Sequence, residues 1–189
     1  MIASEGISSL GGDDFDQVLA SMALRAAGIE SGIGGLSEAE LFRLMDECRV
    51  KKEALHPNTR KISIDLEAAR EGLGSVSLAA ADYYEECRPL IEETARLVED
   101  LIAAQTESEI DALYVTGGGS ELPAVAGVLR EVFGRRVRRS AYTRSATAIG
   151  LAIQADAQAG YVLREKVHRY FGVWREAEEG RRVVFDPLF

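Results

Sequence analysis

Apolar residues in the first third of the chain recur at the three- and four-residue spacing of amphipathic helices. This spacing predicts a helix that starts at Asp13 or Asp14 and stops at Gly28, and a second helix over residues 37–55. Ser37 and Glu40 have the spacing of a capping box, which marks the start of the second helix. The glycine-rich stretch between the helices, residues 29–35, is predicted to be a flexible connector.

The pattern then changes to alternation. Residues 61–69 and 72–80 alternate apolar with polar side chains around a glycine-rich turn, which predicts a β-hairpin. Helical spacing returns over residues 80–104, where the internal Pro89 predicts either two helices or one kinked helix. A wide apolar stripe on this segment indicates burial against a sheet, and it comprises Leu90, Ile91, Thr94, Leu97, Val98, Leu101 and Ile102.

Residues 112–160 follow the order strand, glycine loop, helix, strand, helix. This order is typical of an α/β fold in which helices cover a sheet. The last of these helices, residues 146–160, carries apolar residues around much of its circumference, so we expect it to be packed on several sides. The arginine-rich strand at 135–139 is predicted to be a sheet edge protected by charge, although it also resembles a nucleic-acid patch. Residues 170–189 are predicted to form a terminal hairpin.

Composition limits the partners. The 189 residues are 47% apolar, enough for a buried core, and carry a formal charge of −9. The negative field argues against nucleic acid and anionic membrane surfaces as partners. No long apolar run or signal-peptide pattern is present, so we expect a cytoplasmic chain. The spacing of Cys48, Cys87, His56 and His168 favours neither a zinc site nor a disulfide framework.

The most informative motif is the glycine loop from Thr116 to Pro123. Gly117, Gly118 and Gly119 follow a strand and precede a helix, with Ser120 and Glu121 after them. Glycines in this place let the backbone approach a ligand, and the free amides of a helix start attract anions. A tight strand-to-helix turn needs glycine whether or not it binds anything, so both interpretations stay open.

Two further clusters carry candidate chemistry. Arg49, Lys52 and His56 form a basic helix face whose stems could lie along an adenine or ribose, although cations also complement a helix end. Gly12 and the aspartates after it could serve a magnesium nucleotide, or could simply cap a helix. No nucleophile motif surrounds either histidine, which argues against a catalytic triad.

Several of these segments occur in a familiar order. The segments LGGDDFD, CRVKKEAL followed by ISIDL, YYEE, YVTGGGSELP and ATAIGLAIQA together resemble the C-terminal lobe of the actin-like ATPase domain of DnaK-type heat-shock chaperones. The resemblance implies an α/β lobe with a helical and hairpin subdomain at 11–78, a sheet subdomain at 79–160, and a helix and hairpin extension at 161–189. In that family adenosine binds in the crevice between the two subdomains.

The resemblance implies a set of adenosine-site residues by position. These are Gly12, Arg49, Lys52, His56, Gly117, Gly118, Gly119, Ser120 and Glu121. Three of them depart from the family pattern: Arg49 replaces a glutamate, His56 a serine, and Glu121 an arginine that could stack on adenine. We expect Arg49 to supply the missing cation from the opposite wall and to pair with Glu121.

Both phosphate loops of the family are missing from this sequence. Phosphoryl transfer needs metal, phosphate clamps and a positioned water together, so we expect the chain alone to be inactive. The resemblance then implies an ATP- or ADP-binding lobe of a chaperone-like ATPase, with Mg²⁺ bound in the full-length parent and extended peptides held by a downstream domain. The alternatives are a non-catalytic actin-like interaction module and half of a sugar or acetate kinase. The terminal hairpin, with exposed Phe171 and Trp174, is predicted to form a dimer contact.

Overall fold

The computed structural model describes residues 5–104, 110–156, 158–160, 172–177 and 182–187. Its α-helices are α1 (Gly12–Ala26), α2 (Glu38–Glu53), α3 (Ala80–Ala103), α4 (Pro123–Phe133) and α5 (Ala146–Ala155). Its strands are β1 (Lys61–Asp65), β2 (Ser75–Ala79), β3 (Leu113–Val115), β4 (Val137–Arg139), β5 (Gly172–Ala177) and β6 (Arg182–Pro187). Short 3-10 turns are η1 (Gly32–Gly35), η2 (Gly118–Glu121) and η3 (Gly134–Arg136).

Helix α1 begins at Gly12, one or two residues before the predicted start, and α2 begins directly after the predicted cap residue Ser37. The Asp14 carboxylate accepts a hydrogen bond from the Gly11 amide at 2.7 Å, and at the start of α2 the Ser37 amide donates to Glu40 Oε2 at 2.7 Å. Glu40 N in turn donates to Ser37 Oγ at 3.4 Å, which completes the predicted capping box. The connector before α2 differs from the prediction, because it contains the helical turn η1 rather than only irregular chain.

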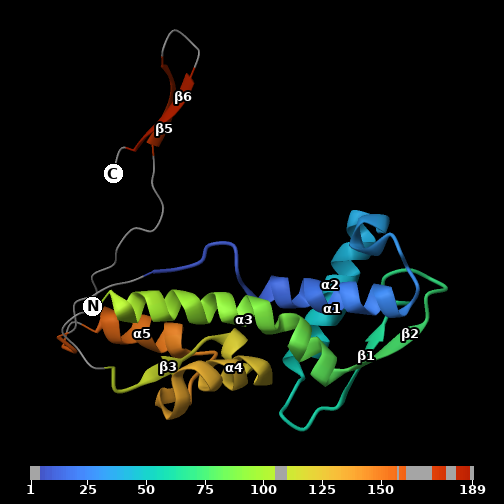
Figure 1. Cartoon of the computed structure of the whole chain (residues 1–189), viewed down its shortest axis with the longest axis horizontal. Coiled ribbons are helices and arrows are strands. Elements are labelled where there is room, and N and C mark those ends of the chain that lie inside the picture. The colour runs from blue at the N-terminus through green and yellow to red at the C-terminus, as the bar shows by residue number, and fades with distance from the viewer. Residues whose placement is uncertain (1–4, 105–109, 157, 161–171, 178–181, 188–189) are drawn as a thin grey trace.

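The predicted hairpin is confirmed. Strands β1 and β2 pair antiparallel, with Ile62 opposite Leu78 and Ile64 opposite Val76. Ile62 and Ile64 are buried while their neighbours along β1 are exposed, as alternation requires. The pair packs beside α1 and α2, and together these elements form the right-hand part of the molecule in Figure 1.

Helix α3 connects the two parts of the fold. It is a single helix with Pro89 inside it, and Figure 1 shows that it bends. Its buried positions are Ala80, Tyr83, Cys87, Ile91 and Ala95, spaced three or four residues apart. Of the predicted stripe, Ile91 is buried, Thr94 is exposed and the other members are half-buried. Helix α3 packs on α1, β2 and α4 rather than on a broad sheet.

The expected strand–helix–strand order is present beyond α3. Strands β3 and β4 pair in parallel, with Leu113 opposite Val137, and α4 is the crossover between them. Gly134 ends α4 with a φ of +65°, a conformation that favours glycine. Within residues 110–156 this sheet has only two strands, and Arg138 and Arg139 lie exposed on β4, as predicted for an edge.

One core links these layers. Tyr83 is fully buried near its centre, and its hydroxyl donates a hydrogen bond to the Phe15 carbonyl oxygen at 3.2 Å. The buried set extends from Leu19 and Leu44 to Leu129 and Val137, so the two parts of the fold share one apolar cluster. No helix among the described residues is long and apolar enough to cross a bilayer.

The helix at 146–160 does not match its prediction. Every residue of α5 after Ala146 is exposed, including Leu151 at 59% and Ile153 at 44%. The expectation that it packs on several sides is therefore wrong for the part of the chain that the structure describes. Strands β5 and β6 form the expected terminal hairpin and lie apart from the helices in Figure 1. Phe171 and the helix expected at the start of 161–189 lie outside the described residues.

Candidate functional site

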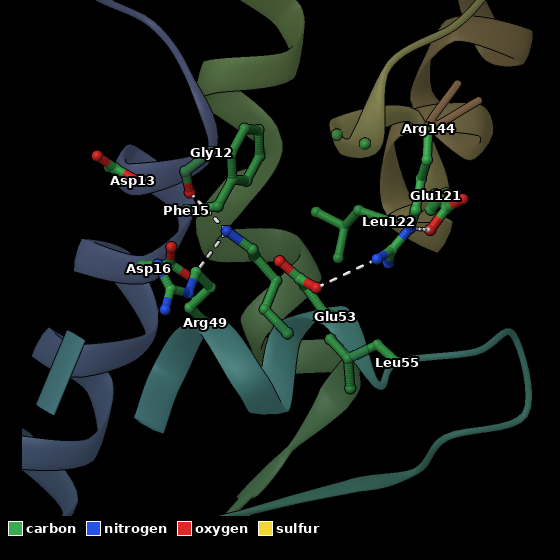
Figure 2. Close-up of a pocket in the computed structure, with 13 residues that line it drawn as sticks. Gly12, Asp13, Phe15, Asp16, Arg49, Glu53, Leu55, Glu121, Leu122 and Arg144 are labelled. Carbon is green, nitrogen blue, oxygen red and sulfur yellow. Dashed lines mark hydrogen bonds and ion pairs between the residues drawn. The ribbon is translucent and has the colours of Figure 1, made fainter. Parts of the chain in front are cut away.

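A pocket of about 370 Å³ lies between the start of α1, the end of α2 and the glycine turn η2 (Figure 2). Segments distant in sequence meet there, because α3 holds α1 and α4 on neighbouring sides. The lining residues are Gly12, Asp13, Phe15, Asp16, Arg49, Lys52, Glu53, Leu55, Gly118, Gly119, Glu121, Leu122 and Arg144.

Lys52 ties the end of α2 to the start of α1. Its Nζ donates a hydrogen bond to the Gly12 carbonyl oxygen at 2.7 Å and lies 2.8 Å from Asp16 Oδ1. The Lys52 side chain is 14% exposed and that of Asp16 only 3%. An ammonium has three protons, so these two contacts leave one for a ligand in the pocket.

Asp16 is the buried acid of the site. Burial raises its pKa, while the ammonium of Lys52 opposes that rise by favouring the carboxylate. The nearby Asp13 carboxylate raises the pKa further, and Arg49 lowers it. Asp16 therefore depends on Lys52 for its charged form, and the pair behaves as one unit.

The glycine turn forms the opposite wall. Gly117 has φ +90° and ψ +159°, a region that is nearly exclusive to glycine. Its amide donates to the Thr143 carbonyl oxygen at 2.9 Å, and the buried Ser120 hydroxyl donates to the Gly117 carbonyl oxygen at 2.7 Å. Gly118 and Gly119 then line the pocket, with nothing within 4 Å of where a Cβ would lie. Their backbone is open to a ligand.

Arg144 bridges the two walls. Its Nε lies 2.8 Å from Glu121 Oε2 and its Nη1 lies 3.3 Å from Glu53 Oε2. Thr143 Oγ1 donates a second hydrogen bond to Glu121, at 2.5 Å. The hydroxyl of Thr143 and the guanidinium of Arg144 together hold the pKa of Glu121 below its ordinary value.

The pairing of Arg49 with Glu121 is wrong. Arg49 instead forms an ion pair with Asp46, one turn earlier on α2. An i,i+3 partner on the same helix is always within reach, whereas Glu121 already has Thr143 and Arg144. The cation facing Glu121 comes from the segment before α5, not from α2.

The structure brings six of the nine predicted residues around one pocket, namely Gly12, Arg49, Lys52, Gly118, Gly119 and Glu121. Gly117 and Ser120 shape the turn behind the lining. His56 lies exposed outside the pocket, where its amide donates to Thr59 Oγ1. The predictions missed Phe15, Asp16, Glu53, Leu55, Leu122 and Arg144.

The missed residues had weak sequence signals. Asp16 is the third aspartate in GDDFD, and the sequence does not say which of the three turns inward. Arg144 lies directly before a helix and after a strand, the kind of place where a side chain reaches the end of a sheet.

The pocket combines three kinds of contact. Phe15, Leu55 and Leu122 supply apolar surface, Lys52 and Arg144 supply cationic donors, and the glycine turn supplies exposed backbone. Small-molecule sites typically have such an apolar lining with a few placed polar groups. Such a lining suits a small organic molecule that has both apolar and polar surfaces.

Comparisons with known proteins agree on one family. The profile of the family described as Hsp70 protein matches residues 1–168. The chain is 29% identical over 162 residues to the chaperone protein HscA homolog of Burkholderia ambifaria (strain MC40-6), and 30% identical over 163 residues to that of Variovorax paradoxus (strain S110). Each match covers 85% of this chain but 26% and 25% of the relative. The chain thus spans about a quarter of the length of these curated relatives.

Proposed function

Because this chain belongs to the Hsp70 family, we propose that its pocket binds the adenosine part of ATP or ADP as one lobe of an actin-like ATPase domain. The observation that carries the proposal is the meeting of Gly118 and Lys52 across one hollow. These residues are 66 positions apart in the sequence, and both were predicted ligand contacts. The subdomain division at residues 78 and 79 follows from the same proposal, with the pocket at the seam.

Each wall has a defined part in this proposal. The exposed backbone at Gly118 and Gly119 lets a ligand approach closely, because no Cβ intervenes. The remaining proton of Lys52 donates to a ribose hydroxyl or a phosphate oxygen. Phe15, Leu55 and Leu122 exclude water from the flat faces of the base.

The charges of the pocket fit the nucleoside better than a metal ion. Asp16, Glu53 and Glu121 are each paired with a lysine or arginine. Mg²⁺ is usually held by carboxylates and by substrate phosphates, and these carboxylates already have cationic partners. We therefore assign Mg²⁺ to the phosphates in the parent protein, and we expect no ATP hydrolysis by this chain alone. Peptide binding belongs, in the same proposal, to a downstream domain.

The proposal is tested by titrating adenosine and ADP into the chain while its thermal unfolding is followed. A ligand that binds only the folded state raises the unfolding midpoint as its concentration rises. Gly118→Leu fills the pocket wall and should abolish the rise. Gly127→Leu makes the same substitution at an exposed position of α4 and should leave the rise intact.

A second function is favoured by the pairing of the pocket's charges. Lys52, Arg49 and Arg144 already have carboxylate partners. Their charges are therefore balanced without a bound nucleotide, as expected of a pocket that no longer binds one. That chain would be a non-catalytic interaction module. Equal unfolding midpoints with and without adenosine or ADP, in both wild type and Gly118→Leu, would favour it over the nucleotide-binding proposal.

A further inference from the structure

Arg144 occupies an unusual place in the lobe. Residues 11–79 and 110–156 are described without a gap, and the Arg144–Glu53 pair is the only ion pair or hydrogen bond that joins these two segments directly. The same guanidinium pairs with Glu121 at the end of the glycine turn. Arg144 therefore lies across the pocket between its two walls, as Figure 2 shows.

The geometry of the pairs leaves part of Arg144 free. Glu121 and Glu53 meet the nitrogens Nε and Nη1, which lie on the edge of the planar guanidinium. Contacts in the plane of the group do not cover its two flat faces. The Arg144 side chain remains 58% exposed although it makes two ion pairs, so these pairs leave much of it accessible.

The apolar residues of the same pocket suit a flat ring. Leu122 comes from the glycine turn and Leu55 from the end of α2, and both line the same pocket beside the bridge. A guanidinium held by two carboxylates stacks on aromatic rings without losing further side-chain freedom, since its orientation is already fixed. The net charge of the three groups also stays low, which favours a neutral ring over an anion at this point.

We propose that Arg144 is the base-binding residue of the pocket, with one guanidinium face stacked on the purine while Glu121 and Glu53 hold its edge. This inference rests on the proposed nucleotide function and adds to it the residue that selects a planar base. Arg49, which the sequence suggested for this part, also lines the pocket, but it pairs with Asp46 on its own helix and does not join the two walls. In this proposal Arg144 contributes to the affinity for the base and not to the affinity for the sugar or the phosphates.

The test uses 2-aminopurine riboside, a fluorescent purine whose emission is quenched by stacking. The wild-type chain should bind it with quenched emission. Arg144→Ala should bind about tenfold more weakly, the size expected for a partly desolvated cation–π contact, and its bound probe should recover emission. Arg144→Lys keeps the charge but lacks the flat face, so it should not restore the quenching.

Arg88→Ala is the matched control, because Arg88 also joins two elements by ion pairs, here α3 to Glu131 on α4, away from the pocket. It should bind and quench as wild type does. Ribose 5-phosphate, which lacks a base, should compete equally with wild type and Arg144→Ala. Wild-type quenching in Arg144→Ala or in Arg144→Lys, or the same loss in Arg88→Ala, would overturn the inference while leaving nucleotide binding intact. A wild-type chain that binds no purine riboside would overturn the proposed function together with it.

Discussion

Gly117 is the residue whose backbone most constrains the site. Its φ of +90° with ψ of +159° lies where side chains other than hydrogen clash with the backbone. We expect Gly117→Ala to lower the free energy of unfolding by about 1–3 kcal/mol, the usual cost of such backbone strain. Urea unfolding followed by circular dichroism measures the change.

Gly118→Ala is the control for this prediction. Gly118 has no positive φ, and a Cβ there meets nothing within 4 Å, so its stability should stay near that of wild type. Equal losses in both variants would mean that the turn is sensitive to any side chain, and the argument from the backbone conformation of Gly117 would be wrong.

Single residues show where sequence reasoning succeeds and where it stops. Gly118 and Lys52 could be predicted, because a strand–glycine–helix order and a basic helix face are local patterns. The partners of the charged groups could not. Lys52 meets Asp16, and Arg144 meets Glu53, only after segments 36 and 91 positions apart have packed together. Any of several carboxylates would have satisfied the sequence equally well.

At the scale of elements, Glu40 fastens α2 to the turn that follows β1. Arg70 Nε lies 2.5 Å from Glu40 Oε1, and Arg70 Nη2 also donates to the Gly35 carbonyl oxygen at 2.9 Å. The guanidinium of Arg70 holds the pKa of Glu40 well below its ordinary value, helped by the amide and hydroxyl of Ser37. The carboxylate form is therefore the one that stabilises this junction.

The sign of the pH dependence follows from this lowered pKa. The unfolded chain binds a proton at Glu40 near pH 4.3, whereas the folded chain binds it only at lower pH. The contribution of Glu40 is complete above about pH 5 and is lost as the pH falls through the lowered value. Glu40→Gln should thus have a lower melting temperature than wild type at pH 7, and the difference should shrink as the pH falls below about 4.

Glu38→Gln, in the same first turn of α2, is the matched control for thermal melts between pH 3 and pH 7. It removes the same charge near the helix start but not the contact with Arg70. A difference between wild type and Glu40→Gln that stays constant across this range would contradict the assignment to the Glu40 carboxylate.

Element types were largely predictable, and their packing was not. The hairpin, the capped helix α2 and the β3–α4–β4 unit follow from period and turn residues. For α3 the apolar pattern gave the helix and one residue of its buried face, Ile91, and for α5 it gave the helix only. In α3 the buried set includes Cys87 and Ala95, small side chains that hydropathy does not single out beside Leu90 or Leu97. For α5 the apolar pattern predicts burial on several sides, but its residues after Ala146 are exposed in the part of the chain that the structure describes.

At the scale of the molecule, two apolar surfaces lie open. One is α5 with Ile149, Leu151 and Ile153, and the other is the β5–β6 hairpin with Trp174 and Val183. In the isolated chain both surfaces are candidates for self-association. Substitutions on one surface at a time can show which of them forms the contact.

The hairpin has the stronger features of a contact between copies. Trp174 lies opposite Phe185 with ring centroids 5.1 Å apart, and the register places Val183 on the same face two residues away. Trp174 is nevertheless 71% exposed and Val183 60%. A two-stranded sheet also has unpaired backbone groups on its outer edges, which favour pairing with another strand.

We therefore expect the isolated chain to form a dimer through this hairpin, with Trp174 buried in the contact. Trp174→Ser combined with Val183→Thr should shift the chain to a monomer in analytical ultracentrifugation, because it removes the apolar face without adding a charge. Leu151→Ser on α5 is the control and should leave the dimer in place. A wild-type monomer at every concentration would show that the hairpin face does not self-associate. A dimer that survives the hairpin changes but dissociates in Leu151→Ser would instead assign the contact to α5.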